Sequence, residues 1–489
     1  MGYHLLTGAT GLLGSYVLRD CLLKGHRMAI LLRARRTKSA RQRAEILLAH
    51  WEQELGRVLP RPVVIEGDLS RPGLGLGGAD RNWISRHCHA AIHNAASLTF
   101  FGTDRQREPW LSNVEGTRRV LDLCARAGIR HFHYVSTAYV CGLREGRILE
   151  TELDMGQEMA NDYERSKVEA EMLVRRANLG APATIYRPSI IVGDSRTGYT
   201  STFHGFYAMV KFAHTLAQYM VRGSTSAQLL IDGFGLTGHE GKDYVPVDWV
   251  SAVITHLLGR PEHQGRTYHL TAQKPTSVAV WSGAIQEAVE RYSPLADPSD
   301  SSAGDAEWFE TMFRRQAEHY RPYWRDDPQF DRAALVAATA DVPCPVVDHE
   351  MLVRMARFAI ETKFGRRTQR PLASDWNARA HMQPWLTAVP VAESTDSGSI
   401  HVGVQVNGPG GGQWKLMARD GRVWAAEDGI DGQCGAVVHL SSDTFRSLAA
   451  RQVSVEQALR QGRITVAGDD TDASVLESLL ECIVTPEAA

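Results

Sequence analysis

Tyr163 and Lys167 are the residues of this sequence best placed to do acid–base chemistry. They lie four positions apart in a stretch with a helical pattern, so both side chains are expected on one face of a helix. A tyrosine hydroxyl has a pKa of about 10, but a neighbouring ammonium favours the phenolate and lowers that pKa. Ser136 and Thr137 add two hydroxyls at the end of a predicted strand. Together these side chains predict general acid–base catalysis.

A glycine-spaced turn near the N-terminus indicates the fold that would position these side chains. Residues 3–6 read as a strand and residues 15–19 as a helix. Between them, Gly8 makes the turn, Gly11 lets the backbone approach a pyrophosphate, and Gly14 lets helix and strand pack closely. The free N–H groups at the helix start favour a phosphate. The turn therefore predicts a dinucleotide site formed by Gly8, Thr10, Gly11, Leu12, Leu13 and Gly14.

The residues after the second predicted strand, 27–32, indicate which dinucleotide is bound. An NAD-preferring fold places an acid here, about twenty residues past the turn, to hold the ribose 2′-hydroxyl. This chain has Arg33, Arg35 and Arg36, and no carboxylate before Glu45. Guanidinium groups match a 2′-phosphate in charge and in geometry. NADPH is therefore the expected cofactor, with Arg33 at its 2′-phosphate; the alternative is a solvated basic loop.

Strands and helices alternate along the first half of the chain. Further strands are expected at 63–69, 90–96 and 133–139, with a helix over 38–56. This alternation predicts an α/β fold with a doubly wound parallel sheet, a Rossmann fold, and a ligand at the carboxyl edge. Asp68 ends one strand and could accept from an adenine amino group. The small-residue turn Asn94, Ala95 and Ala96 ends another, where a cofactor could lie against the backbone.

Composition excludes several other classes of protein. The 489 residues suggest two or three domains, and a net charge of −2 gives no electrostatic footprint for nucleic acid. Seven scattered cysteines without a C-x-x-C pair argue against a disulfide framework or a zinc site, so no metal is expected. No apolar run is long enough to span a membrane, and the first strand leaves no room for a signal peptide. The cytoplasm is the expected compartment.

The chain resembles an extended short-chain dehydrogenase/reductase over about residues 3 to 275. Within that family it is similar to the branch of fatty acyl-CoA reductases and thioester reductase domains. The segments that carry this resemblance are Leu31–Arg33, Glu66–Ser70, His93–Ala96, Asn113–Thr117, Val135–Val140 and Tyr244–Asp248.

The resemblance implies a role for each of the candidate residues. Thr137 would orient the substrate oxygen, with Ser136 as second choice, although a strand-end hydrogen bond explains Ser136 equally well. Tyr163 would be the general acid, and Lys167 would lower its pKa and bind the nicotinamide ribose. The cofactor would also contact Leu69, Asn113 and Pro188, besides the residues already named.

These residues do not determine the substrate. An aromatic-rich stretch, 199–220, is either core or the wall of an acyl tunnel. The resemblance favours reduction of a hydrophobic acyl thioester to an aldehyde, or further to an alcohol. The thioester would be on coenzyme A or on a separate carrier protein. The alternatives are a ketone or hydroxysteroid oxidoreductase and a non-catalytic lipid-binding protein.

The boundaries predicted from composition divide the chain into three parts. Residues 1–293 form the reductase domain, with substrate-covering elements from about 195–293. Residues 294–379 comprise a linker, 294–306, and a mostly helical segment that weakly resembles the tail of bacterial acyl reductases, with a packing role.

Residues 380–489 form a small α+β domain that resembles a sterol-carrier protein. That resemblance implies an apolar tunnel for a lipid-like ligand, which would present or shield the acyl group. The alternative is a module that serves only for packing or for a homodimer.

Overall fold

The computed structural model describes residues 2–55, 59–102, 104–219, 235–293, 321–365, 376–386, 400–408, 410–419, 422–430, 434–468 and 479–483. The predicted linker, 294–306, lies outside these ranges. Of the helices described, none is long and apolar enough to cross a membrane. Four of the cysteines, Cys21, Cys88, Cys124 and Cys141, are buried.

A seven-stranded parallel sheet forms the centre of the reductase part, in the order β11-β7-β5-β4-β1-β2-β3. Its strands are β1 (Tyr3–Thr7), β2 (Met28–Leu32), β3 (Val63–Glu66), β4 (Cys88–His93), β5 (His131–Val135), β7 (Thr184–Pro188) and β11 (Thr267–Leu270). All residues of β1 and β2 are buried, as expected for strands covered on both faces. The strand order reverses between β1 and β4, and ligands bind at the carboxyl ends beside such a point. The predicted doubly wound fold is confirmed.

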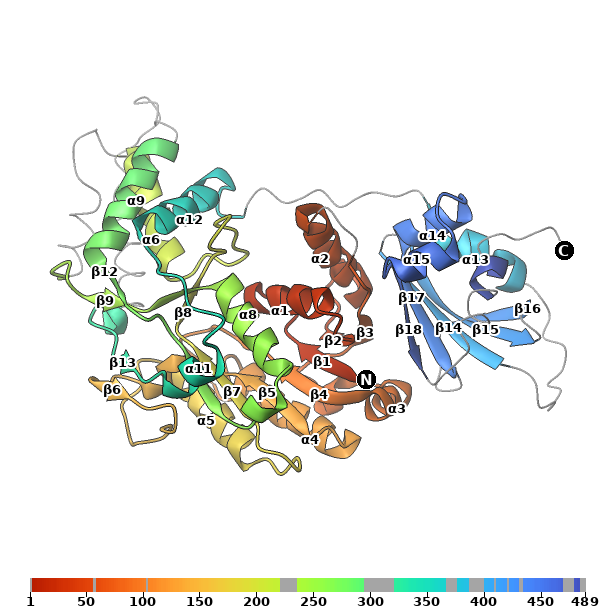
Figure 1. Ribbon diagram of the computed structural model, residues 1–489, viewed down its shortest axis with the longest axis horizontal. Helices are drawn as coiled ribbons and strands as arrows, with labels where there is room; N and C mark the ends of the chain where they lie inside the picture. Colours follow the sequence, from red (N-terminus) through yellow and green to blue (C-terminus); the bar gives the residue numbers. More distant parts are fainter. Residues whose placement is uncertain are drawn as a thin grey trace.

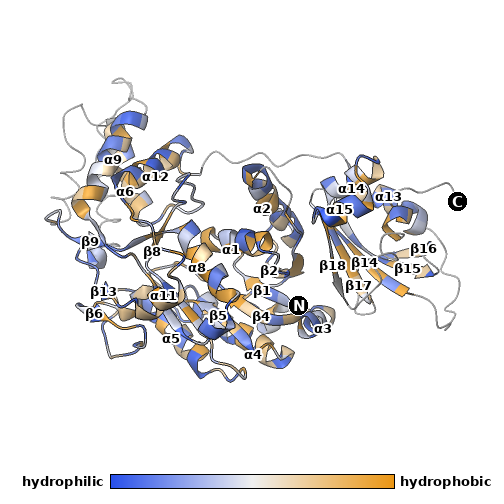
Figure 2. Ribbon diagram, in the orientation of Figure 1, coloured by the Kyte–Doolittle hydropathy of each residue, from blue (hydrophilic) through white to orange (hydrophobic). Residues whose placement is uncertain are grey.

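Helices cover both faces of this sheet (Figure 1). One face carries α1 (Leu12–Leu23), α2 (Ala40–Leu55), α8 (Val247–Leu258) and the short α11 (Ala333–Ala338); the other carries α3 (Gly78–His87), α4 (Thr117–Ala127) and α5 (Asp162–Arg176). A π-helical turn, Leu111–Gly116, leads into α4. Hydrophobic residues line the sheet and the inner sides of the helices (Figure 2).

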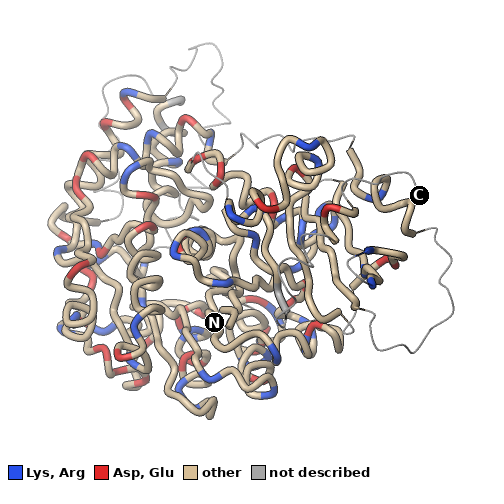
Figure 3. Tube along the Cα trace, turned by 45° about the vertical axis from the view of Figure 1, so that its right-hand side comes forward, with Lys and Arg blue, Asp and Glu red and all other residues tan. Residues whose placement is uncertain are grey.

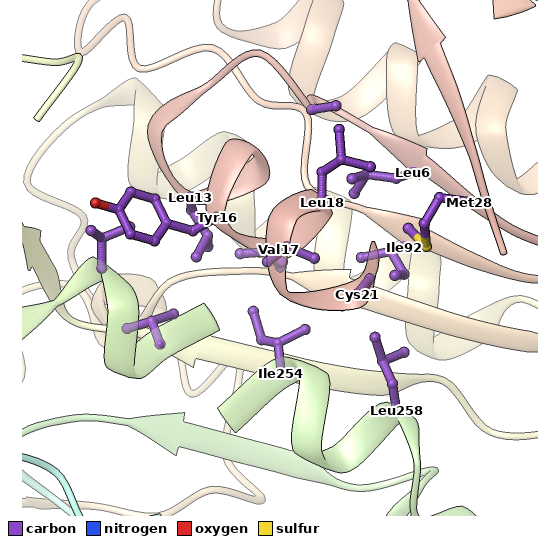
Figure 4. Packing of buried hydrophobic residues seen from close by; sticks show 14 of the residues in the cluster. Leu6, Leu13, Tyr16, Val17, Leu18, Cys21, Met28, Ile92, Ile254 and Leu258 are labelled. Atoms are coloured by element: carbon purple, nitrogen blue, oxygen red, sulfur yellow. The ribbon is translucent and has the colours of Figure 1, made fainter. Parts of the chain in front are cut away.

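The packing of α1 onto the sheet fixes the position of the glycine turn. Val17 and Cys21 of α1 face Ile254 and Leu258 of α8, and Leu18 lies against Leu6 of β1 (Figure 4). These side chains are almost fully buried. Because α1 is held between β1 and α8, its N-terminus is held at the carboxyl edge of the sheet.

A second layer of elements lies beyond that edge and forms a separate apolar cluster. It contains β8 (Ile190–Val192), β10 (Tyr244–Pro246), α6 (Phe206–Tyr219), α9 (Val278–Tyr292) and α12 (His349–Glu361). Three short pairs complete this region: β8 with β10, β9 (Gly241–Lys242) with β12 (Thr276–Ser277), and β6 (Arg147–Ile148) with β13 (Gln329–Phe330). The segment 321–365, expected to be mostly helical, therefore supplies both strand and helix; its helix α12 packs within the substrate-covering layer, whereas α11 packs against the central sheet.

The C-terminal residues form a five-stranded mixed sheet with helices on one face. The strand order is β16-β15-β14-β17-β18. The strands are β14 (Ile400–Asn407), β15 (Gly412–Arg419), β16 (Arg422–Asp428), β17 (Ala436–Ser441) and β18 (Ile464–Gly468), and the helices are α13 (Ala378–Leu386), α14 (Ser442–Ala449) and α15 (Val455–Arg460). The predicted α+β character is confirmed. Acidic and basic residues are interspersed over both parts of the chain (Figure 3).

The C-terminal domain lies beside α2, on the far side of the molecule from α6, α9 and α12 (Figure 1). The Thr465 hydroxyl donates to the Arg61 carbonyl oxygen at 2.6 Å, and the Tyr3 hydroxyl donates to the Val466 carbonyl oxygen at 3.0 Å. This placement is next to the cofactor half of the reductase.

Candidate active site

The glycine turn has the geometry that a dinucleotide needs. Gly8 has a φ of +76°, and a Cβ atom there would lie 2.7 Å from the Ala95 nitrogen. A Cβ atom at Gly14 would lie 2.1 Å from the Gly8 carbonyl oxygen, so only glycine allows this close approach. Gly11 precedes the first turn of α1, and its position carries no side-chain cap. The N–H groups of that turn are therefore available to a phosphate.

One cavity of about 750 Å³ joins this turn to the catalytic candidates. Gly11, Leu12 and Leu13 line it at the start of α1, and Asn94, Ala96 and Pro188 line it at the ends of β4 and β7. The same cavity is lined by Ser136, Thr137, Tyr163 and Lys167. The structure thus brings together the glycine turn and all four residues predicted to be catalytic.

Tyr163 sits in the first turn of α5, and the Thr137 hydroxyl is its polar neighbour. Burial and the adjacent Glu164 carboxyl raise the pKa of Tyr163 above its usual value, and a hydrogen bond with Thr137 partly offsets this. Thr137 also accepts from the Tyr139 backbone N–H at 3.3 Å, which fixes its side chain. Two hydroxyls are therefore held together at one place in the cavity, as an oxyanion site requires.

Lys167 lies one turn further along α5 and is 2% exposed. Its ammonium donates to the Tyr134 hydroxyl oxygen and to the Val135 carbonyl oxygen, both at 2.8 Å. Burial lowers the pKa of Lys167 to about 7, although the negative charge of Glu171 acts to raise it. The sequence predicted Tyr163 as the partner of this ammonium, whereas the contacts in the structure are with the end of β5.

Ser136 uses its hydroxyl in a buried ion-pair network. It donates to Glu171 Oε2 at 2.7 Å. Both Glu171 oxygens also accept from Arg187, at 2.7 and 3.1 Å, and neither side chain of this pair is exposed. The contact is the strand-end hydrogen bond that the sequence offered as the alternative for Ser136.

One arginine that the sequence analysis did not single out lies where a 2′-phosphate is expected. Arg43 of α2 donates to the Thr10 hydroxyl at 2.7 Å and to the Arg33 carbonyl oxygen at 2.6 Å. Burial and the nearby Arg35 and Arg33 guanidinium groups lower the pKa of Arg43. A dianion bound among these groups would relieve their mutual repulsion, so the residues present fit a 2′-phosphate.

Asp68 and Leu69, which follow β3, are two further cofactor candidates. Asp68 lies near Arg33; burial raises its pKa, but hydrogen bonds from Ser70 and the charge of that arginine hold it below the usual value. Leu69 packs against Gly116, at the end of the π-helical turn.

Asn113 has a structural role. Its amide bonds the Ser97 backbone N–H at 2.7 Å and the Ser166 hydroxyl at 2.9 Å, which ties the turn after β4 to α5. Ala95 donates to Thr7 from the same turn.

The segment that follows residue 320 closes one side of the cavity, and no local pattern predicted this. Tyr323 and Trp324 line the cavity. The Tyr323 hydroxyl donates to Glu164 Oε1 and accepts from Asn161, each at 2.6 Å. Lys242 donates to the Tyr323 carbonyl oxygen from behind. The wall is therefore anchored to the start of the catalytic helix.

The rest of the lining is largely aromatic and comes from the second layer. It includes Phe203, Phe206, Tyr207, Phe212, Tyr244 and Trp281. Several of these residues also belong to the buried cluster of that layer, so the stretch 199–219 serves both as core and as cavity wall. Among the described residues, no group of three or more His, Cys, Asp and Glu side chains could hold a metal ion.

Comparison with known proteins also indicates a dinucleotide-binding protein, as the geometry of the glycine turn does. Residues 6–254 match the model of an NAD-binding family described as "Male sterility protein". Aldehyde reductase lnaA of Aspergillus flavus is 25% identical over 400 residues, which cover 73% of this chain and 36% of that protein. The isonitrile lipopeptide synthase of Streptomyces coeruleorubidus is 29% identical over 52% of this chain and 16% of its own length. The chain thus spans about a third or less of these relatives.

Solved structures show the same fold. The terminal R domain from the myxalamid PKS-NRPS biosynthetic pathway has 27% sequence identity and a TM-score of 0.58, over 76% of this chain and 93% of that one. The reductase (R) domain of a nonribosomal peptide synthetase from Mycobacterium tuberculosis, at 23% identity, has a TM-score of 0.52 over 73% of this chain and 91% of that one.

Proposed function

The chain belongs to the male sterility protein family, whose model covers just over half of its length, and from that premise we propose that it reduces a hydrophobic acyl thioester to an aldehyde with NADPH. Family membership makes it an oxidoreductase with a nicotinamide cofactor. The cofactor's 2′-phosphate, the thioester and the aldehyde product are parts of the proposal.

A single observation carries the proposal. One cavity begins at the phosphate-binding turn, passes Thr137, Tyr163 and Lys167, and ends among aromatic side chains of α6 and α9. A nicotinamide cofactor, a carbonyl group and an apolar acyl group would each find matching chemistry in that order.

The two hydroxyls at the centre of the cavity would act on the thioester carbonyl. Thr137 and Tyr163 would donate to its oxygen and stabilise the negative charge that develops there. The nicotinamide, when bound, supplies the hydride for the carbonyl carbon. Proton transfer from Tyr163 then gives a hemithioacetal, and loss of the thiol leaves the aldehyde. Ser136 would not take part, because its hydroxyl donates to Glu171.

The relatives favour a carrier protein over coenzyme A as the source of the thioester. Several are nonribosomal peptide synthetases by name, including asaC of Aspergillus flavus at 26% identity over 56% of this chain. A solved structure with the same fold is a thiolation-reductase di-domain from an archaeal non-ribosomal peptide synthetase, which joins a reductase to a thiolation domain. A fatty acyl-CoA substrate is the alternative that the resemblance from sequence had left open.

We also propose a sterol-carrier type for the C-terminal domain. Its five-stranded sheet with helices α13 and α14 over one face supports this assignment. A lipid-like ligand would lie between the sheet and these helices. The domain would not handle the acyl group in the cavity, because it lies beside α2.

Turnover with chosen substrates tests the proposed reaction. The full chain would be mixed with NADPH and with acyl thioesters of a phosphopantetheinylated carrier protein or of coenzyme A, and with hydrophobic ketones. We expect NADPH oxidation with release of free thiol and aldehyde for the carrier-bound thioester. Oxidation with ketones alone would assign the chain to ketone reduction instead, and coenzyme A thioesters as the better substrates would reverse the choice of carrier.

Replacing Arg43 with alanine tests the choice of NADPH. The guanidinium would make a charge-assisted contact with the 2′-phosphate, worth about 1.5–3 kcal/mol, so the Kd for NADPH should rise roughly 10- to 100-fold. The Kd for NADH should hardly change, as measured by nicotinamide fluorescence. Arg36→Ala, in the exposed loop after β2, is the matched control and should leave both constants unchanged. Equal losses for both cofactors in Arg43→Ala would place the 2′-phosphate elsewhere.

A further inference from the structure

Lys167 is held from behind by a tyrosine that does not line the cavity. The Tyr134 hydroxyl oxygen is 2.8 Å from the Lys167 ammonium nitrogen, and the same nitrogen lies 4.4 Å from the centroid of the Tyr134 ring. Tyr134 is 1% exposed and sits in β5, beneath the catalytic helix. The Val135 carbonyl oxygen is the second acceptor, so two of the three ammonium hydrogens are used in hydrogen bonds to β5.

The hydrogen bonds beyond Tyr134 have a defined direction. Thr117 donates to the Asn113 carbonyl oxygen at 2.6 Å, so its oxygen can only accept from its other neighbours. His93 Nε2 approaches that oxygen at 3.0 Å, and Tyr134 is a further hydrogen-bonding neighbour of Thr117. A buried network thus continues from Lys167 through Tyr134 to Thr117 and His93.

The tautomer of His93 follows from the same series. Because the Thr117 hydroxyl donates to the Asn113 carbonyl oxygen, His93 Nε2 carries the ring proton and donates to Thr117. His93 Nδ1 therefore accepts from the Thr7 hydroxyl at 2.7 Å. Burial and Lys167 lower the pKa of His93 to about 3, so the ring is neutral, as this arrangement requires. The network links the glycine turn to the catalytic lysine through buried groups alone.

We propose that Tyr134 is a positioning residue, which holds the Lys167 ammonium so that its one remaining hydrogen faces the cavity. That hydrogen has no partner among the residues that the structure describes, and Lys167 lines the cavity where the nicotinamide ribose and Tyr163 would lie. The proposal rests on the function proposed above, which needs Lys167 charged and in place.

Loss of the Tyr134 oxygen should change the titration of Lys167. The titratable groups that interact with this ammonium are Glu171 on α5, Tyr134 on β5 and His93 on β4. Only Tyr134 among them accepts a hydrogen bond from the ammonium, and this favours the charged form. Without that acceptor, burial should lower the pKa of Lys167 further, and the alkaline limb of the kcat profile should move to lower pH.

Tyr134→Phe tests the proposal, with Tyr186→Phe as the matched control. Tyr186 is a fully buried tyrosine of β7 whose hydroxyl bonds His133 at 3.0 Å, away from Lys167. We expect kcat to fall roughly tenfold in Tyr134→Phe, the size of one hydrogen bond to a charged group, with the alkaline limb shifted to lower pH. The control should keep the wild-type profile. An unchanged profile in Tyr134→Phe, or the same shift in both variants, would overturn the proposal.

A second measurement does not depend on the substrate. Acetic anhydride acylates only neutral amines, so the pH midpoint of Lys167 labelling, read by mass spectrometry of the full chain, reports its pKa. The midpoint should be lower in Tyr134→Phe than in wild type and in Tyr186→Phe. If wild type reduces no carbonyl compound, the proposed function fails while the labelling still decides the role of Tyr134. Should Tyr134→Phe not fold, Thr117→Val should shift the midpoint in the same direction, and no shift would refute the network.

Discussion

Tyr163→Phe is expected to abolish turnover and to leave NADPH binding intact. Its hydroxyl is the proton donor of the proposed reaction and one of two donors to the developing oxyanion. Acid–base groups contribute about 10²–10⁴ to rate, and an oxyanion donor contributes about 10²–10³. A fall in kcat of at least about 10³-fold follows if both roles are lost together. Single-turnover oxidation of NADPH measures it.

The control for this variant separates chemistry from packing. Tyr268→Phe removes the hydroxyl of another buried tyrosine, which donates to the His263 carbonyl oxygen outside the cavity. Its turnover should stay within about twofold of wild type, because a contact made away from the reacting atoms does not change transition-state stabilisation. Tyr163→Phe with near-normal turnover, or with lost NADPH binding, would remove Tyr163 from the role of proton donor.

Glu171→Gln is expected to have the largest effect on stability. Glu171 and Arg187 form an ion pair with no exposed side-chain surface, and Glu171 also accepts from Ser136. The variant leaves a buried guanidinium without a counter-charge, which typically costs about 3–5 kcal/mol. Thermal and urea unfolding should both show the loss.

Arg175→Gln is the matched control for the ion pair. Arg175 also pairs with Glu171, but its side chain is 32% exposed and the pair lies one helical turn apart. Such a pair contributes about 0.3–0.5 kcal/mol, so the control should be nearly neutral. A loss in Arg175→Gln as large as that in Glu171→Gln would mean that the network does not depend on burial.

The effect of Glu171→Gln should also depend on pH. Burial raises the pKa of Glu171, but Arg187, Arg175 and Ser136 together hold it below its usual 4.5. The ionised carboxylate therefore adds stability that is fully present above that value and is lost as the pH falls through the lowered pKa. The difference between wild type and variant should shrink in strong acid and stay constant above pH 4.5.

The central fold could be predicted from sequence because its signals are local. The turn at Gly8, the buried runs of β1 and β2, and the alternation of strands with helices each lie within a few tens of residues. The four-residue spacing of Tyr163 and Lys167 likewise placed both on α5, because the helical repeat leaves no other arrangement. The end of the sheet where they meet follows from the handed winding of the fold.

The partners of these side chains could not be predicted in the same way. Lys167 was expected to act on Tyr163, but it bonds Tyr134, 33 positions earlier. Tyr323 reaches the catalytic helix across 159 positions, and its own neighbourhood carries no pattern that points there. Arg43 was within a predicted helix, yet which face of that helix meets Arg33 depends on how α2 packs.

By itself, the sequence determined that this chain folds as a dinucleotide-binding sheet with a tyrosine–lysine helix at its carboxyl edge. Only the tertiary structure decided that Ser136 serves an ion pair, that Tyr323 closes the cavity, and that the C-terminal domain lies beside α2. The physical reason is that periodicity and turn chemistry act between near neighbours, whereas a hydrogen-bond partner is chosen by burial among groups distant in the chain.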